Sequence, residues 1–209
     1  QEFNQISVAL MNDLDHNQWI DIYTRLVSWS LEMDGYLELG LKQTLLDQYK
    51  ECNLAFGKYV ERNYRDWIER TDNRPPLSPE IVDRFVIPEL QTDKTVIFFV
   101  IDCLRLDQWL MMEGLLHDYY EISKEFYFSI LPTATPYSRN AIFSGSYPSE
   151  VELRHPELWE KSEDDESSRN RYERQFLDKL LERRKIILKP EPKYVKILDA
   201  EFGRGIESN

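Results

Sequence analysis

The chain has 209 residues, of which 42% are apolar, and its 38 acidic residues against 26 basic ones give a net charge of −12. This size and composition are typical of a globular protein that buries a sizeable core. The acidic balance argues against duplex DNA as a ligand, because tight nucleic-acid binding relies on neutralisation of phosphates by Lys and Arg.

Two further global features concern where the protein works. Its cysteines, Cys52 and Cys103, lie far apart without a CxxC pair, so no disulfide framework is expected and a reducing cytoplasmic location is predicted. No apolar run reaches 18 residues, which predicts that the chain does not insert into a membrane. The first residue is Gln1 rather than Met, and we expect the chain to be a piece of a longer protein.

Residues 1–72 are predicted to form a small helical bundle that acts as a connector. Apolar residues recur every three or four positions along two stripes, a spacing typical of helices that pack against one another. The two stripes are Trp19, Ile22, Leu26, Trp29 and Met33, and Leu45, Tyr49, Cys52, Phe56 and Tyr59. Two interpretations stay open, a unit for connection or dimerisation and simple core packing.

Residues 73–93 are predicted to be a linker, because prolines interrupt a turn-rich stretch. We expect Ser78 to cap a short helix from Pro79 to Phe85, since Pro is well tolerated in the first helical turn.

Residues 94–209 are predicted to form an α/β domain with a mostly parallel sheet, because strand and helix patterns alternate. The segment 95–101 (TVIFFVI) is β-branched and aromatic, as in a strand covered on both faces. The further expected strands are Tyr119–Ile130 and residues 193–198. The expected helices are Leu106–Leu116, Thr135–Ser144 with a stop at Gly145, and Tyr172–Arg184.

Asp102 directly follows the predicted buried strand and is therefore a candidate metal ligand. A carboxylate in this position lies at the carboxyl edge of the sheet, where α/β proteins place ligands. A metal ion would also offset the cost of keeping a charge there. The alternative is that Asp102 caps the next helix, since Asp is a favoured N-cap residue.

Thr135 is a candidate nucleophile and metal ligand, because Pro136 suits the first position of a helix whose N-cap is Thr135. An N-cap hydroxyl lies in the positive field of the helix end, near amides that hold anions. Coordination to a metal would activate the hydroxyl as a nucleophile. The alternatives are a purely structural cap and Thr133 in the same role from the preceding loop.

Arg105 and Arg139 are candidate phosphate-binding residues, since one follows Asp102 closely and the other lies one turn into the Thr135 helix. Surface ion pairing is the alternative for each, and we expect Asp107 to pair with a nearby base. The three histidines form no cluster with ligand spacing. The residues alone therefore predict an α/β domain with a metal-assisted hydroxyl nucleophile, and no other catalytic motif competes.

Two stretches, VIFFVIDCLRLDQW (96–109) and LPTATPYSRNAIFSGSYPSE (131–150), resemble the alkaline phosphatase superfamily. Its members carry an Asp after the first strand, then P-T-x-T, then S/T-G-x-x-P. The residues that match in this order are Asp102, Pro132, Thr133, Thr135, Ser144, Gly145 and Pro148. The chain most resembles the PglZ domain within this superfamily. Nearly all of it resembles the region after the receiver domain in PorX-type response regulators of the Bacteroidetes type IX secretion system.

The superfamily resemblance implies a zinc-dependent phosphoesterase with two metal ions, in which Thr135 is the nucleophile and a ligand and Asp102 binds the same ion. The PorX-type resemblance implies a phosphodiesterase that acts on cyclic or linear oligonucleotides. It also implies a homodimer controlled by a receiver domain. The implied protein partners are type IX secretion system components, a sigma factor or a sensor kinase.

The chain departs from the superfamily pattern in the ligands expected downstream, because it has no Asp-His-Gly and no histidine after His155. We therefore expect a fragment, namely the connector helices and the first half of a PglZ domain without a receiver domain. Such a fragment would hold at most a partial metal site and would be inactive alone. The alternative function is a non-catalytic module for signalling, dimerisation and partner docking.

Overall fold

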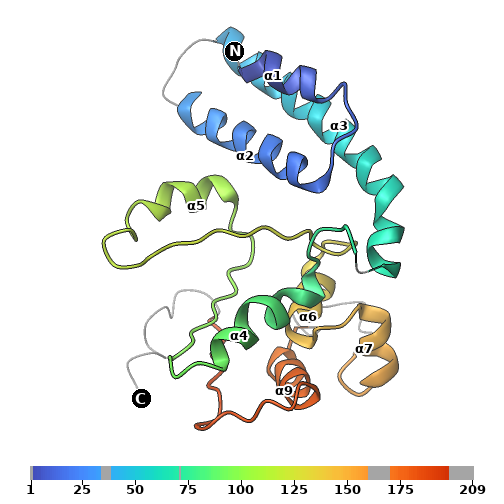
Figure 1. The fold of residues 1–209 in the computed structure, drawn as a ribbon, viewed down its shortest axis with the longest axis vertical. Helices are drawn as coiled ribbons and strands as arrows, with labels where there is room; N and C mark the ends of the chain where they lie inside the picture. The colour runs from blue at the N-terminus through green and yellow to red at the C-terminus, as the bar shows by residue number, and fades with distance from the viewer. Residues whose placement is uncertain (1, 34–38, 71, 160–169, 198–209) are drawn as a thin grey trace. The chain divides into compact units, whose positions relative to one another are not determined.

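A computed structural model describes residues 2–33, 39–70, 72–159 and 170–197 of the chain (Figure 1). Its packing divides the chain into two compact units, each of which is described by itself. Unit 1 comprises residues 1–76 and 98–128, and unit 2 comprises residues 77–97 and 129–209. The regular elements of the described residues are helices.

Unit 1 is built on the helices α1 (Glu2–Ala9), α2 (His16–Met33) and α3 (Leu39–Glu69), and it also contains α5 (Leu106–Glu113). Helix α3 contacts both α1 and α2, and α5 packs against α2 (Figure 1). Asp15 and Gln18 fix the start of α2, because each side chain accepts a hydrogen bond of 2.9 Å from the backbone N–H of the other. The helices predicted in this part of the chain are therefore confirmed.

The predicted apolar stripes form the core of unit 1. Seven of their ten members are buried, namely Trp19, Ile22, Leu26, Met33, Leu45, Cys52 and Tyr59. The rings of Trp19 and Phe56 meet edge to face with centroids 5.3 Å apart, and Tyr59 contacts Trp67 at 5.5 Å. Phe128 joins this cluster through contacts with Phe56 at 5.7 Å and Trp67 at 5.3 Å, so aromatic packing holds the end of the segment 98–128 in unit 1.

Unit 2 is organised around α6 (Thr135–Ser144), which contacts α9 (Glu173–Arg183), α7 (Pro148–Arg154) and the 3₁₀ helix η1 (Ser78–Glu80). The π-helix η2 (Val82–Val86) leads directly into α4 (Ile87–Leu90). Apolar side chains of several of these segments form the core. They include Leu77, Val82, Ile130, Ala141, Phe143, Val151, Phe176 and Leu180.

Helix α6 ends at Gly145, as predicted. This glycine has a φ of 57°, the left-handed conformation that closes many helices. The guanidinium of Arg183 donates hydrogen bonds of 3.0 Å to the carbonyl oxygens of Ser144 and Gly145. A cation at this position also interacts favourably with the negative end of the helix dipole.

The predicted α/β fold with a mostly parallel sheet is wrong, because the part of the chain that the structure describes contains no β-strand. Residues 95–101 have no regular secondary structure, and Ile97 and Phe99 are 71% and 73% exposed. Residues 120–127 and 193–197 also lack regular structure, and Leu198 lies outside the described residues. Strand propensity reflects packing in a sheet, and it fails here because these segments join no ladder of strands in the described residues. At the end of the second segment, the backbone N–H of Phe128 donates one hydrogen bond of 2.8 Å to the carbonyl oxygen of Pro76.

Two local predictions are also corrected. The hydroxyl oxygen of Ser78 accepts a hydrogen bond of 3.1 Å from the backbone N–H of Ile130, so Ser78 ties two segments of unit 2 together rather than capping a helix. Residues Ser78–Leu90 form η1, η2 and α4 instead of one helix from Pro79 to Phe85. Helix α5 ends at Glu113, three residues before the predicted end, and turns follow.

Candidate functional site

Asp102 lies in an exposed turn that precedes α5. Its Oδ1 accepts a hydrogen bond of 3.0 Å from the backbone N–H of Cys103, which has a φ of 58°. Helix α5 begins at Leu106 and its N-cap is Arg105, so the alternative in which Asp102 caps this helix is wrong. The local turn thus holds the Asp102 carboxylate at the surface of unit 1, where it is accessible to a ligand.

Thr135 is the first residue of α6, and Ala134 occupies the N-cap position. The predicted range of this helix, Thr135–Ser144, is confirmed, but the N-cap role of Thr135 is wrong. The hydroxyl of Ser138 lies 3.2 Å from the carbonyl oxygen of Thr133 and 3.3 Å from that of Ala134, which fastens the preceding loop to the first turn. Thr135 is half-buried there and Thr133 is exposed, and the positive end of the helix dipole acts on both.

Arg105 forms an ion pair with Asp107, as the alternative interpretation of both residues predicted. Its Nε and Nη2 donate to the two carboxylate oxygens of Asp107 at 3.0 Å and 2.6 Å. This fork-like contact holds the pKa of the Asp107 carboxyl below its ordinary value and raises the pKa of the guanidinium. Both groups face solvent, so the pair adds little to stability.

Arg139 is held by Glu173 of α9, a completely buried carboxylate. Arg139 Nη2 lies 2.6 Å from Glu173 Oε1, and the hydroxyl of Tyr194 donates to Glu173 Oε2 at 2.6 Å. Burial, followed by the contact with the Glu173 carboxylate, raises the pKa of the Tyr194 hydroxyl. Sequence reasoning missed Glu173. The spacing of Glu173 could have indicated its burial. Glu173 lies three residues before Phe176 and seven before Leu180, and therefore on the same buried face of the helix.

The predicted site residues fall into both units. Asp102 and Arg105 belong to unit 1, whereas Thr135 and Arg139 belong to unit 2. In the described ranges no group of three or more His, Cys, Asp or Glu side chains is arranged to hold a metal ion. Since zinc sites take three or four protein ligands, the described residues do not form a zinc site by themselves. None of the described helices is long and apolar enough to cross a membrane.

Comparison with known families defines the class of protein. Residues 81–200 match the family model of the BREX system PglZ alkaline phosphatase-like domain. Because this match spans more than half of the chain, the chain belongs to the PglZ alkaline phosphatase-like family. Residues 1–68 match the PorX response regulator linker domain. These two matches, in this order, confirm the resemblance to PorX-type response regulators, while no curated protein gives a significant match.

Proposed function

We propose that the chain is the linker and effector region of a two-component response regulator that controls type IX protein secretion. In this proposal the effector is a metal-dependent phosphodiesterase that acts on cyclic or linear oligonucleotides. The observation that carries the proposal is a match to the PorX linker followed, in one chain, by a match to a PglZ alkaline phosphatase-like domain. In this proposal the linker passes the signal to the effector domain.

The proposed chemistry assigns roles to four residues. Thr135 is the nucleophile and a zinc ligand, Asp102 is a ligand of the same ion, and Arg105 and Arg139 bind the phosphate. The accessible carboxylate of Asp102 and the place of Thr135 in the first turn of α6 support this assignment. Zinc supplies Lewis-acid stabilisation of a phosphoryl oxygen when bound. The described residues do not complete a zinc site by themselves.

The two arginines proposed to bind phosphate already have carboxylate partners. Each already contacts a carboxylate, Asp107 for Arg105 and Glu173 for Arg139. Phosphate binding therefore requires each guanidinium to share or exchange its present partner. Arg105 exchanges more easily because its ion pair is exposed, whereas Arg139 would leave the buried charge of Glu173 uncompensated. Of the two, Arg105 is therefore the better candidate for direct phosphate contact.

We further propose that the protein works in the cytoplasm as a homodimer. Its partners would be type IX secretion system components, a sigma factor or a sensor kinase. The net charge of −12 supports a ligand other than duplex DNA.

The test of the catalytic assignment compares Thr135→Val with Thr133→Val in the natural polypeptide that contains residues 1–209. Hydrolysis of bis(p-nitrophenyl) phosphate and of a cyclic dinucleotide is measured with zinc, and again after chelation. We expect Thr135→Val to lower kcat by at least about 100-fold and Thr133→Val to change it little. A Thr135→Val protein as fast as the wild type would show that Thr135 is not the nucleophile.

The second candidate function is a non-catalytic module for signalling, dimerisation and partner docking. The match of residues 1–68 to a response regulator linker favours it. Sedimentation velocity of the intact chain over a wide concentration range tests the dimerising role, and a monomer throughout would contradict it. If the natural polypeptide hydrolyses no phosphodiester with zinc present, while Thr135→Val still supports secretion in cells, the non-catalytic function replaces the enzymatic one.

A further inference from the structure

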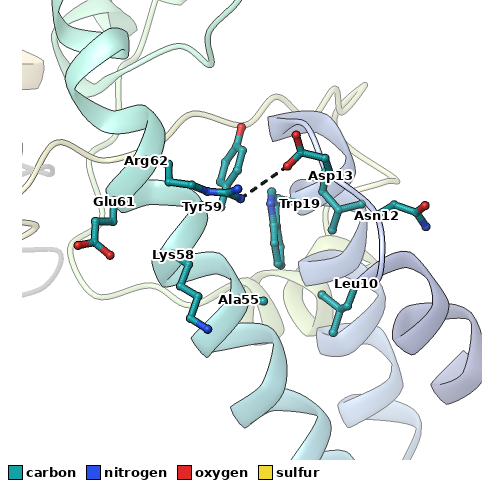
Figure 2. Close-up of a pocket in the computed structure, with 10 residues that line it drawn as sticks. Leu10, Asn12, Asp13, Trp19, Ala55, Lys58, Tyr59, Glu61 and Arg62 are labelled. Atoms are coloured by element: carbon teal, nitrogen blue, oxygen red, sulfur yellow. Dashed lines mark ion pairs between the residues drawn. The ribbon is translucent and has the colours of Figure 1, made fainter.

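Unit 1 contains a pocket of about 390 Å³ that none of the roles above uses. It lies where the connection between α1 and α2, the start of α2 and one face of α3 meet (Figure 2). Apolar side chains form part of the wall and charged side chains form the rim. The wall includes Leu10, Leu14, Trp19 and Ala55, and the rim includes Asp13, Lys58 and Arg62.

The Trp19 indole supplies an unpaired hydrogen-bond donor to this pocket. Trp19 is only 6% exposed, and its buried Nε1 has no acceptor among the described residues. Contacts with Phe56 at 5.3 Å and Tyr59 at 5.9 Å fix the plane of the ring, so the N–H cannot turn towards another partner. Figure 2 shows the nitrogen-bearing end of Trp19 directed towards Asp13 and Arg62. A buried donor without an acceptor is rare, because it forfeits a hydrogen bond made in water.

Arg62 of α3 lies beside this donor, whereas the ammonium group of Lys58 lies at the other end of the pocket, near Ala55 (Figure 2). Lys58 and Arg62 lie four residues apart and therefore on the same face of the helix. Arg62 contacts Asp13 at 3.6 Å, and these side chains are 65% and 92% exposed. Such an exposed pair contributes little free energy. Arg62 can therefore exchange Asp13 for another anion with little loss.

We propose that this pocket binds a carboxylate attached to a small branched aliphatic group. The carboxylate accepts a hydrogen bond from the indole N–H of Trp19 and pairs with Arg62. The aliphatic group contacts Leu10, Leu14 and Ala55. In the absence of the ligand, Asp13 pairs with Arg62, and it therefore competes weakly with the ligand carboxylate. This inference does not depend on the phosphodiesterase proposal, because it uses side chains of the linker-like region alone.

The test is an NMR titration of the intact ¹⁵N-labelled chain. The chain has five tryptophans, so the Trp19 indole signal is assigned by its loss in Trp19→Phe. The probe is 4-methylpentanoate, and 4-methylpentanamide is its neutral match. We expect a saturable downfield shift of the Trp19 indole proton with the acid and a much weaker response with the amide. Trp19→Phe keeps an aromatic ring in the core, and it should bind the acid more weakly.

Rim variants separate binding from folding, because these side chains are exposed. Arg62→Gln should lower the affinity for 4-methylpentanoate about tenfold. Asp13→Asn should raise this affinity a few-fold, because Asp13 then no longer competes for Arg62. The matched control is Arg65→Gln, which removes an 86% exposed arginine of α3 outside the pocket and should change nothing. Any one of three results would overturn the proposal. They are equal responses to the acid and the amide, a Trp19 indole signal that does not move at tens of millimolar acid, and an unchanged affinity for the acid in Arg62→Gln.

Two peptide arms identify the source of the carboxylate. Acetyl-Leu-Leu with a free carboxyl terminus is compared with its amide, and acetyl-Leu-Glu-amide is compared with acetyl-Leu-Gln-amide. If acetyl-Leu-Leu binds and its amide does not, the pocket recognises the carboxyl terminus of a peptide. If acetyl-Leu-Glu-amide binds and acetyl-Leu-Gln-amide does not, the pocket recognises an acidic side chain. Binding of 4-methylpentanoate with neither peptide assigns it to a small organic acid, because a peptide is then excluded.

Discussion

Arg139 of α6 and Glu173 of α9 form an ion pair of 2.6 Å around a carboxylate that is completely shielded from solvent. Tyr194 donates to the same carboxylate at 2.6 Å, so three segments of unit 2 converge on one negative charge. A charge that is buried in this way is tolerated only while its partners stay in place. The arrangement makes Glu173 a sensitive point of unit 2.

We therefore predict that Glu173→Leu destabilises the protein by about 3 kcal/mol, because it leaves Arg139 without its carboxylate and Tyr194 without its acceptor. Glu173→Gln should cost less, since the amide oxygen still accepts from Tyr194. Urea unfolding followed by circular dichroism measures both. Asp178→Asn, at an exposed position of the same helix, is the control and should change stability by less than about 0.5 kcal/mol. A Glu173→Leu protein as stable as the control would refute the assigned role.

The glycine that ends α6 gives a second prediction. A Cβ on Gly145 would lie 2.8 Å from Leu180 Cδ1, and the φ of 57° is strained for any L side chain. We expect Gly145→Ala to lower the free energy of unfolding by about 1–3 kcal/mol. Gly57 in the middle of α3 is the matched control, because a Cβ there meets no atom within 4 Å apart from the adjacent backbone of its own helix. Gly57→Ala should stabilise the protein by about 0.5–1 kcal/mol, and the same sign for both substitutions would contradict the prediction.

The hydrogen bond between Ser78 and Ile130 predicts a third effect. Ser78→Ala removes the hydroxyl that accepts the hydrogen bond of the Ile130 N–H, in a completely buried environment. The expected loss of stability is about 1–3 kcal/mol, the usual penalty for a buried unsatisfied amide. Hydrogen exchange of the Ile130 amide should accelerate together with this loss. Ser149→Ala, at an exposed serine, serves as the control, and unchanged exchange at Ile130 would count against the bond.

Tyr59 predicts how stability depends on alkaline pH. Burial, reinforced by Asp15 and Asp13, raises the pKa of the Tyr59 hydroxyl to about 12 from its ordinary value of 10.0. A folded-state pKa above the unfolded one contributes stability that is complete below pH 10 and is lost as the pH rises towards 12. The free energy of unfolding should therefore fall less steeply across this window in Tyr59→Phe than in the wild type. Tyr119→Phe, at a 78% exposed tyrosine, is the control, and identical slopes for all three proteins would contradict the prediction.

Features fixed by local spacing were the ones that the sequence predicted correctly. The stripe through Trp19, Ile22 and Leu26 was identified because a helix buries every third or fourth residue. The stop at Gly145 and the pairing of Asp107 with a nearby base have the same local origin. The range of α6, Thr135–Ser144, was also predicted, although its N-cap is Ala134 rather than Thr135.

Features that depend on distant partners were not predicted. The segment 95–101 has the composition of a buried strand, yet a strand also needs a neighbour whose backbone pairs with it, and composition cannot supply that neighbour. The contact between Arg139 and Glu173 joins residues 34 positions apart, and Ser78 meets Ile130 across 52 positions. Of the candidate site, the helix at Thr135 followed from local patterns, whereas the exposed turn at Asp102 and the partner of Arg139 did not.

The aromatic contacts of Phe128 have a consequence for synthesis of the protein on the ribosome. Helices α1 to α3 are complete once residue 69 has been made, but Phe56 and Trp67 lack their contacts with Phe128, which follows 59 positions after the end of α3. The nascent bundle therefore exposes an aromatic surface during that interval. We expect it to recruit chaperones then, and a protein that ends at residue 72 to aggregate more readily than the intact chain.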